Sequence, residues 1–191
     1  MISSDREFSG PFRKLGIEEL NRLSVEEFKT APKIPVTVIL DNVRSLHNIG
    51  SIFRTCDAFR IESLFLCGIS ATPPHREIHK SALGAEDSVS WQYFPSAIEA
   101  VQYLKEKGYT LITVEQTENS KKLEDFVPVQ NCSYGLVFGN EVRGVSQQIA
   151  DQSDLALEIP QLGTKHSFNV SVTAGIVLWE FFKTMHTWED T

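Results

Sequence analysis

The sequence is poor in cysteine and has no long apolar run, and these two shortages exclude several classes of protein. Its 191 residues include three cysteines, Cys56, Cys67 and Cys132, which are widely separated and show no CxxC spacing. An odd number of scattered cysteines argues against a disulfide scaffold and favours reduced thiols in a cytoplasmic protein. The first residues lack the apolar core of a signal peptide, and no apolar run reaches membrane-spanning length, so we expect no membrane association.

Positive charge is also scarce. The chain has 18 lysines and arginines against 25 aspartates and glutamates, for a formal net charge of −7. This balance counts against a protein that binds nucleic acid through its overall charge. A local basic patch stays open if the fold gathers the scattered cations, which include Arg44, Arg54, Arg60, Arg76, Lys80, Arg143 and Lys165.

Several signature motifs are missing. Neither GxGxxG nor a P-loop is present, which argues against a dinucleotide-dependent oxidoreductase and a phosphate cradle. The stretch HREIH places His75 and His79 four residues apart, but its carboxylate is misplaced for HExxH and no third ligand is spaced nearby. We therefore expect no metal site and interpret the two histidines as solvated or facing RNA.

What the sequence does contain is an alternation of short apolar runs with helical patterns. The expected strands lie at 36–41, 63–68, 88–94, 109–116, 134–139 and 155–159, and the expected helices near 48–59, 76–83, 96–107, 146–150 and 168–186. This alternation predicts an α/β fold with a mostly parallel sheet flanked by helices on both faces. Residues 15–30 have helical spacing and are followed by a break at APKIP, so we expect an N-terminal helical extension over 1–33 and one α/β domain over 34–191.

Polar residues gather where the expected strands end. Segments 41–44, 115–117, 139–144 and 160–163 follow four of these strands and hold much of the chain's Asn, Gly and isolated charge. Ligands of parallel α/β sheets bind at the carboxyl ends of strands, so these segments are candidates for a binding site. Turns between strands and helices use the same residue types for geometry alone, which leaves that second interpretation open.

Two candidate motifs lie at these strand ends. In LDNVRSLHNIGSIFRTCDAF, a helix starting near Asn48 carries Arg54 beside its apolar stripe. This arrangement is typical of a capped helix with a surface arginine, or of an arginine that binds an anion or a phosphate. In VFGNEVRGVS, Glu141 lies between two glycines, which suits either a tight turn or a carboxylate near a closely approached ligand.

The third candidate motif is GTKHSFNVSVTAGIVLWEFF, where a polar stretch precedes the most hydrophobic helix. In one interpretation Ser167 or Asn169 caps this helix and the other polar residues are solvated. In the other, the polar turn encloses a ligand while the helix anchors the turn in the core.

Taken in order, the three motifs resemble those of the SpoU (TrmH-like) RNA ribose 2′-O-methyltransferases of the SPOUT superfamily. The resemblance runs from about Val36 to Phe182. It implies a SPOUT-type domain whose C-terminal segment forms a trefoil knot, S-adenosyl-L-methionine as methyl donor, and a homodimer. The acceptor that it implies is a ribose 2′-hydroxyl of tRNA or rRNA, although neither the RNA nor the nucleotide can be read from the chain.

The resemblance also assigns site residues by position. Arg54 matches the catalytic arginine, and the other catalytic positions are Asn48, Glu141, Ser167 and Asn169. The implied cofactor contacts come from the backbone around Val114, Glu115, Gly139, Ile159, Leu162 and Phe168. The chain departs from the family at Gln161, Phe168 and Val142, where methionine, leucine and glycine are common; since the first two changes affect side chains more than backbone, we expect binding to survive.

The family role of the arginine is to activate the 2′-hydroxyl. Because an arginine side chain stays protonated in proteins, Arg54 is equally suited to hold the adjacent RNA phosphate and stabilise negative charge on the oxygen. Glu141 would position the loop or take part in proton transfer. The rival interpretations are a non-catalytic RNA-binding protein that retains the knotted fold and a base methyltransferase of the same superfamily. Because the net charge is negative, RNA needs a local basic surface. We expect it to lie across a groove of the dimer, where basic residues of one subunit face the cofactor pocket of the other.

Overall fold

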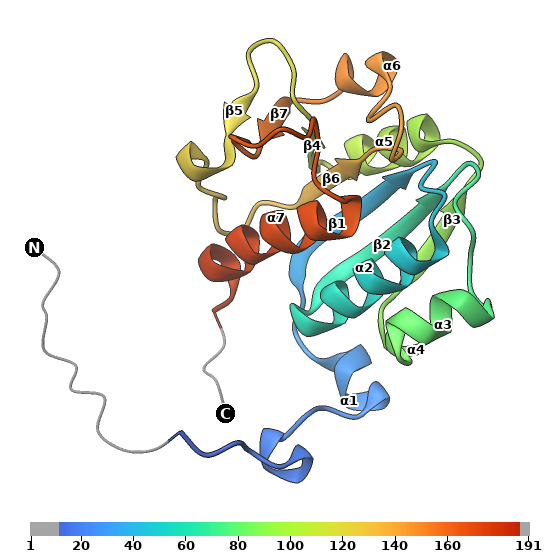
Figure 1. The fold of residues 1–191 in the computed structure, drawn as a ribbon, viewed down its shortest axis with the longest axis vertical. Helices are drawn as coiled ribbons and strands as arrows, with labels where there is room; N and C mark the ends of the chain where they lie inside the picture. Colours follow the sequence, from blue (N-terminus) through green and yellow to red (C-terminus); the bar gives the residue numbers. More distant parts are fainter. Residues whose placement is uncertain (1–11, 188–191) are drawn as a thin grey trace, which may run out of the picture.

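The computed structural model describes residues 12–187, which form a sheet of seven strands with helices on both faces (Figure 1). The strand order is β3-β2-β1-β6-β4-β7-β5, and every neighbouring pair is parallel. The strands are β1 (Ile34–Asp41), β2 (Ile61–Cys67), β3 (Trp91–Phe94), β4 (Thr110–Val114), β5 (Lys121–Lys122), β6 (Tyr134–Phe138) and β7 (Leu155–Glu158). The predicted α/β class with a mostly parallel sheet is therefore confirmed.

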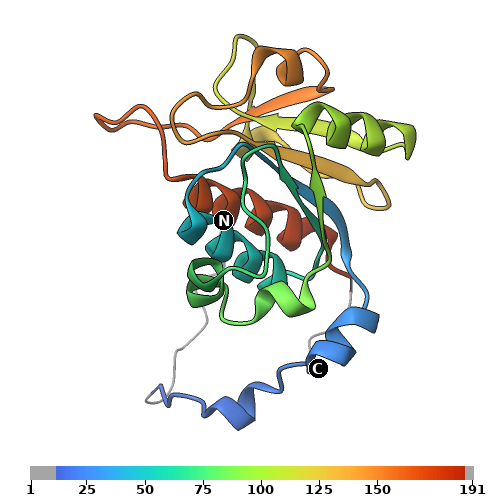
Figure 2. The same cartoon turned by 90° about the vertical axis from the view of Figure 1, so that its right-hand side faces the viewer.

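The helices divide between the two faces of this sheet. They are η1 (Ile17–Leu20), α1 (Val25–Thr30), α2 (Leu46–Ala58), α3 (Arg76–Ala82), α4 (Ala85–Ser88), α5 (Ala97–Glu106), η2 (Leu123–Asp125), α6 (Gln147–Ala150) and α7 (Val170–Met185). Helices α2 and α7 pack side by side on one face, and α5 with α6 covers the other (Figures 1 and 2).

Strand β1 shows why the sequence forms a buried parallel sheet. Its run PVTVILD is apolar except at Thr37 and Asp41 and is buried at nearly every position, as expected for a strand that is covered on both faces. Val38 and Leu40 enter the core beneath α2 and α7, whereas Ile39 enters the core beneath α5. The alternation of side chains across the strand thus supplies both cores from one segment.

Three short elements, β5, η2 and α4, were missed by the sequence pattern. The two-residue strand β5 is Lys121–Lys122, whose exposed side chains give no apolar signal. The short helix α4 occupies part of the expected strand 88–94, which therefore begins only at Trp91.

Helix α2 begins at Leu46 because Ser45 is its N-cap and accepts a hydrogen bond from the Asn48 N–H at 3.2 Å.

The residues before the sheet form short helices. The hydroxyl of Ser24 caps α1, and Phe28 of this helix is buried in the core beneath α2. The first eleven residues of the expected extension over 1–33, and residues 188–191, lie outside the described range. Within residues 12–187, no helix combines the length and the apolar character needed to cross a membrane.

Candidate functional site

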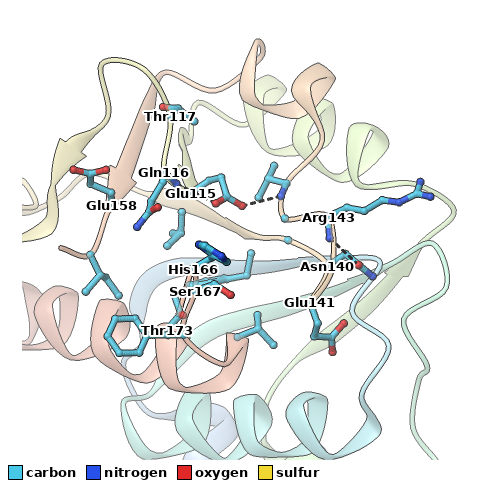
Figure 3. A pocket seen from close by; sticks show the side chains of 18 of the residues that line it. Glu115, Gln116, Thr117, Asn140, Glu141, Arg143, Glu158, His166, Ser167 and Thr173 are labelled. Carbon is cyan, nitrogen blue, oxygen red and sulfur yellow. Dashed lines mark hydrogen bonds between the residues drawn. The ribbon is translucent and has the colours of Figure 1, made fainter. Parts of the chain in front are cut away.

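A cavity of about 710 Å³ opens at the carboxyl ends of β4, β6 and β7 (Figure 3). The segments predicted from strand ends meet here. Of the predicted site residues, those that line the cavity are Val114, Glu115, Gly139, Glu141, Ile159, Ser167, Phe168 and Asn169. Asn48, Arg54 and Leu162 are not part of its lining, and Leu162 is fully exposed.

The loop after β6 forms one wall of the cavity. Asn140 and Gly144 exchange two backbone hydrogen bonds of 3.1 and 2.8 Å, which close the loop into a tight turn. Gly144 has φ +65°, and a Cβ atom there would overlap Oε2 of Glu115. That same oxygen accepts a hydrogen bond from the Val145 N–H at 3.1 Å. The turn therefore needs glycine at 144, and the carboxylate of Glu115 holds its shape.

A hydrogen-bond chain joins the three sequence motifs. Asn48 of α2 donates from Nδ2 to Oε1 of Glu141 at 3.2 Å, and its Oδ1 accepts from Nδ2 of Asn169 at 3.1 Å. Asn48 is buried whereas Glu141 and Asn169 are exposed, so both bonds are partly shielded from solvent. Three residues that are far apart in the sequence thus act as one unit at the edge of the cavity.

Glu141 is the anionic member of this hydrogen-bond chain. Its carboxylate accepts the backbone N–H groups of Arg44 at 3.0 Å and Ser45 at 2.9 Å, in addition to the amide of Asn48. Partial burial raises the pKa of Glu141, but the bonds from Arg44, Ser45 and Asn48 outweigh it and hold the pKa below its ordinary value. These bonds therefore stabilise the fold at neutral pH, and the stabilisation is lost as pH falls through the lowered pKa.

Asn169 explains part of the polar stretch before α7. It is the N-cap of this helix, and its Oδ1 accepts from the Ser171 N–H at 2.9 Å and the Ser171 hydroxyl at 2.7 Å. The capping interpretation of Asn169 is confirmed. Because its other amide atom binds Asn48, the cap also fixes the third motif to the first.

Arg54 lies on the exposed side of α2, six residues beyond Asn48. No hydrogen bond or ion pair joins its guanidinium to any other residue of the segment 12–187. The side chain is thus available to a ligand that approaches α2 from solvent, outside the cavity itself.

Several lining residues were not proposed as ligands from the sequence. They are Gln116, Thr117, Arg143, Glu158, His166 and Thr173. The first three lie within the strand-end segments, and Arg143 is also one of the scattered cations of the possible basic patch. In the view of Figure 3, His166 lies between Gln116 and Ser167 in the middle of the cavity.

The two histidines of HREIH have local partners. Nδ1 of His75 accepts the Glu77 N–H at 3.2 Å and caps α3, and Nδ1 of His79 lies 2.5 Å from Oε1 of Glu86. Across the described range, residues 12–187, no group of three or more His, Cys, Asp or Glu side chains is placed to hold a metal ion.

The chain is similar to known RNA methyltransferases. The model of the SpoU rRNA Methylase family matches residues 35–179. The tRNA (guanosine(18)-2′-O)-methyltransferase of Thermus thermophilus is 32% identical over 163 residues, which cover 85% of this chain and 81% of the relative.

Solved structures share the fold. A TrmH/SpoU tRNA modifying enzyme from A. aeolicus superposes with a TM-score of 0.74 at 26% identity, covering 84% of this chain and 80% of that one. The SpoU methyltransferase AviRb from Streptomyces viridochromogenes, solved in complex with the cofactor AdoMet, gives a TM-score of 0.71 at 24% identity and covers 81% of this chain and 62% of its own.

Proposed function

Because the chain belongs to the SpoU rRNA Methylase family, we propose that it transfers a methyl group from S-adenosylmethionine to the ribose 2′-hydroxyl of a tRNA or rRNA. The observation that carries this proposal is the bonded unit of Glu141, Asn48 and Asn169 beside the cavity. The Thermus thermophilus relative methylates a ribose oxygen of tRNA, and the AviRb structure holds AdoMet on the same fold.

The cavity fits the proposed methyl donor. Its volume of about 710 Å³ lies within the range of about 300–1,000 Å³ that is usual for small-molecule sites. Val114, Ile159 and Phe168 supply apolar surface for a flat base, while the backbone around Gly139 supplies polar groups. Bound S-adenosylmethionine supplies an electrophilic methyl group for direct displacement.

The protein's own groups would align the acceptor and assist the loss of its proton. Arg54, which stays cationic and is exposed on α2, would hold the phosphate next to the target ribose and stabilise negative charge on its oxygen. Glu141 is held by three donors that point to its carboxylate, which suits a positioning role for the loop between β6 and α6. Ser167 lines the cavity and would contact the acceptor ribose.

Single-turnover methylation rates of Arg54→Lys and Arg54→Ala test the catalytic assignment. We expect both variants to bind S-adenosylmethionine as the wild type does, because Arg54 lies outside the cavity. The methyl-transfer rate of Arg54→Ala should fall by about 100-fold or more, the usual cost of removing one electrostatic group from a transition state. The rate of Arg54→Lys should fall by a smaller factor, because lysine keeps the charge but cannot form the bidentate contact of a guanidinium. Wild-type rates in either variant would refute the role of Arg54, and a wild-type protein that transfers no methyl group to RNA would refute the function.

A homodimer is part of this proposal, and α7 offers a surface for it. Val172 and Trp179 of α7 are about half exposed, and the Trp179 ring lies 5.9 Å from that of Phe59 and 5.7 Å from that of Phe182. A second copy covering this face would bury the rings and form a groove for RNA between subunits. Sedimentation of Trp179→Glu should give a lower mass than the wild type, whereas Leu83→Glu, exposed at the C-terminal end of α3, should not; unchanged masses would count against this interface.

Three finer features complete the proposal. The chain after β7 crosses the sheet to bring α7 against α2, which supports a C-terminal trefoil knot; an experimental chain trace without threading would contradict it. Residues 34–191 would form the methyltransferase domain and 1–33 its helical extension, which limited proteolysis near residue 33 tests. The free thiols of Cys56, Cys67 and Cys132 support a cytoplasmic location, which fractionation of cells tests.

A further inference from the structure

Two large aromatic side chains are exposed on the edge of the sheet. Trp91 and Tyr93 of β3 expose 37% and 46% of their surface, although aromatic side chains in strands normally pack against a neighbour. Strand β3 is the outermost strand on its side and faces the viewer in Figure 2. No ring of the described residues stacks on either side chain.

The register of the sheet places both rings on one face. Trp91 pairs with Leu64 and Tyr93 pairs with Leu66, and both leucines belong to the core beneath α2 and α7. The neighbour Phe94 points the other way, since its ring packs 4.7 Å from that of Phe65 beneath α5. Trp91 and Tyr93 are therefore side by side on the α2 face, about 6.6 Å apart along the strand.

Tyr93 of this pair is connected to the catalytic edge by a series of contacts. The hydroxyl of Tyr93 donates to the carbonyl of Gly68 at 3.1 Å. Gly68 lies so close to Asn42 that a Cβ atom there would overlap its Oδ1. The carbonyl of Asn42 accepts from Nδ2 of Asn140 at 2.7 Å, and Asn140 lines the cavity. The exposed rings thus continue the edge at which the loops of the site meet.

We infer that Trp91 and Tyr93 form a stacking platform for two unpaired bases of the RNA substrate. This inference rests on the proposed function, because it places nucleotides that flank the methylated one. Bases that are splayed out of a helix stack on exposed aromatic side chains, and two rings on alternate positions of one strand accept one base each. The platform selects a loop or a single-stranded segment over a continuous duplex, whose bases are already stacked.

RNA fits this surface better than a protein partner does. The loops that begin at Asn42 and Gly68 lead to Arg44 and Arg76, two exposed arginines at the same edge that suit phosphates between the stacked bases. A protein interface would instead need a wide apolar surround with few charges, whereas Arg44 and Arg76 give this edge exposed positive charge. We therefore assign this surface to RNA.

The test compares four variants in binding to one probe. The probe is a single-stranded RNA dodecamer of mixed sequence that carries one 2-aminopurine, alone or annealed to its complement. Trp91→Ala and Tyr93→Ala should each weaken binding of the single strand by at least about five-fold, the smallest effect typical of losing one base–aromatic stack. Tyr93→Phe should retain binding, since it keeps the ring. Gln92→Ala, which pairs in register with Phe65 on the opposite face, is the matched control and should bind as the wild type does.

Three results would overturn the platform. The first is that Trp91→Ala and Tyr93→Ala bind the single strand as the wild type does. The second is that the wild type binds the duplex as tightly as the single strand. The third is that the oligomeric mass of Trp91→Ala or Tyr93→Ala in sedimentation differs from that of the wild type, which would make this face a protein interface. Binding of S-adenosylmethionine by calorimetry should be equal in all variants. Methylation by the wild type is assayed in parallel: absent methylation with an intact stacking effect would refute the proposed function, whereas normal methylation with no stacking effect would refute the platform alone.

Discussion

Replacing Asn48 by aspartate probes the hydrogen-bond chain at its centre. The new aspartate would keep the oxygen that accepts from Asn169, but it would set a second carboxylate where Nδ2 now donates to Glu141 at 3.2 Å. With an effective dielectric constant of about 20, two unit charges at this separation repel by about 5 kcal/mol. The state of lower free energy is the one in which the two carboxylates share one bound proton.

The free energy needed to keep that proton bound determines how much stability the variant loses. Holding a carboxyl with an ordinary pKa of about 3.9 protonated costs about 1.4 kcal/mol for each pH unit above that value. The free energy of unfolding should therefore fall by about 4 kcal/mol at pH 7 and by only about 1.5 kcal/mol at pH 5. The sign follows because the folded variant binds more protons than its unfolded chain, so its stability decreases as pH rises.

Urea unfolding at fixed protein concentration between pH 5 and pH 8 measures this effect. Asn48→Ala is the matched control: it removes both hydrogen bonds without adding a charge, so its loss of about 1–4 kcal/mol should not change with pH across this range. An equal loss for Asn48→Asp at pH 5 and pH 7 would refute the reasoning, because it would mean that Asn48 and Glu141 are not in contact.

Two other predictions follow from local geometry. Gly144→Ala should reduce stability by about 1–3 kcal/mol and weaken binding of S-adenosylmethionine in calorimetry, because residue 144 has a positive φ and the new Cβ would overlap the Glu115 carboxylate. Gly175→Ala, in α7 with no atom outside its own helix within 4 Å of the new Cβ, should do neither, and equal effects of the two changes would contradict this interpretation. The hydroxyl of Tyr109 donates to both oxygens of Glu62, and its pKa is raised to about 12, mainly by burial and secondly by this bond. The ultraviolet titration of Tyr109→Phe should therefore lack one group that ionises near pH 12. The contribution of this bond to the free energy of unfolding is present below a pH of about 10 and is lost as pH rises towards 12. A titration curve of Tyr109→Phe that equals that of the wild type would contradict the raised pKa.

The sequence was sufficient for the fold class because β1 and its neighbours are apolar runs of strand length between helical patterns. It was insufficient for β5, because two exposed lysines pair only through their backbone with β7. Backbone pairing leaves no trace in side-chain pattern when neither face of a strand is buried.

Part of the candidate site was also predictable. The ends of parallel strands meet at one edge, so Glu115, Gly139 and Ile159 could be placed together from the order of strands and turns alone. The hydrogen bond that Asn169 donates to Asn48 could not, because it joins a helix cap to a helix side chain 121 residues away. Leu162 was expected near the cofactor, but it is fully exposed in this structure and its role stays a prediction.

The most direct measurement follows the methyl group itself. The protein is incubated with methyl-labelled S-adenosylmethionine and RNA from a strain that lacks the gene, and the RNA is then hydrolysed with alkali. A 2′-O-methyl group blocks cleavage of the adjacent phosphodiester, so the account predicts label in an alkali-resistant dinucleotide from tRNA or rRNA, strongly reduced with Arg54→Ala. Label on a base, or RNA that stays unlabelled, would contradict it.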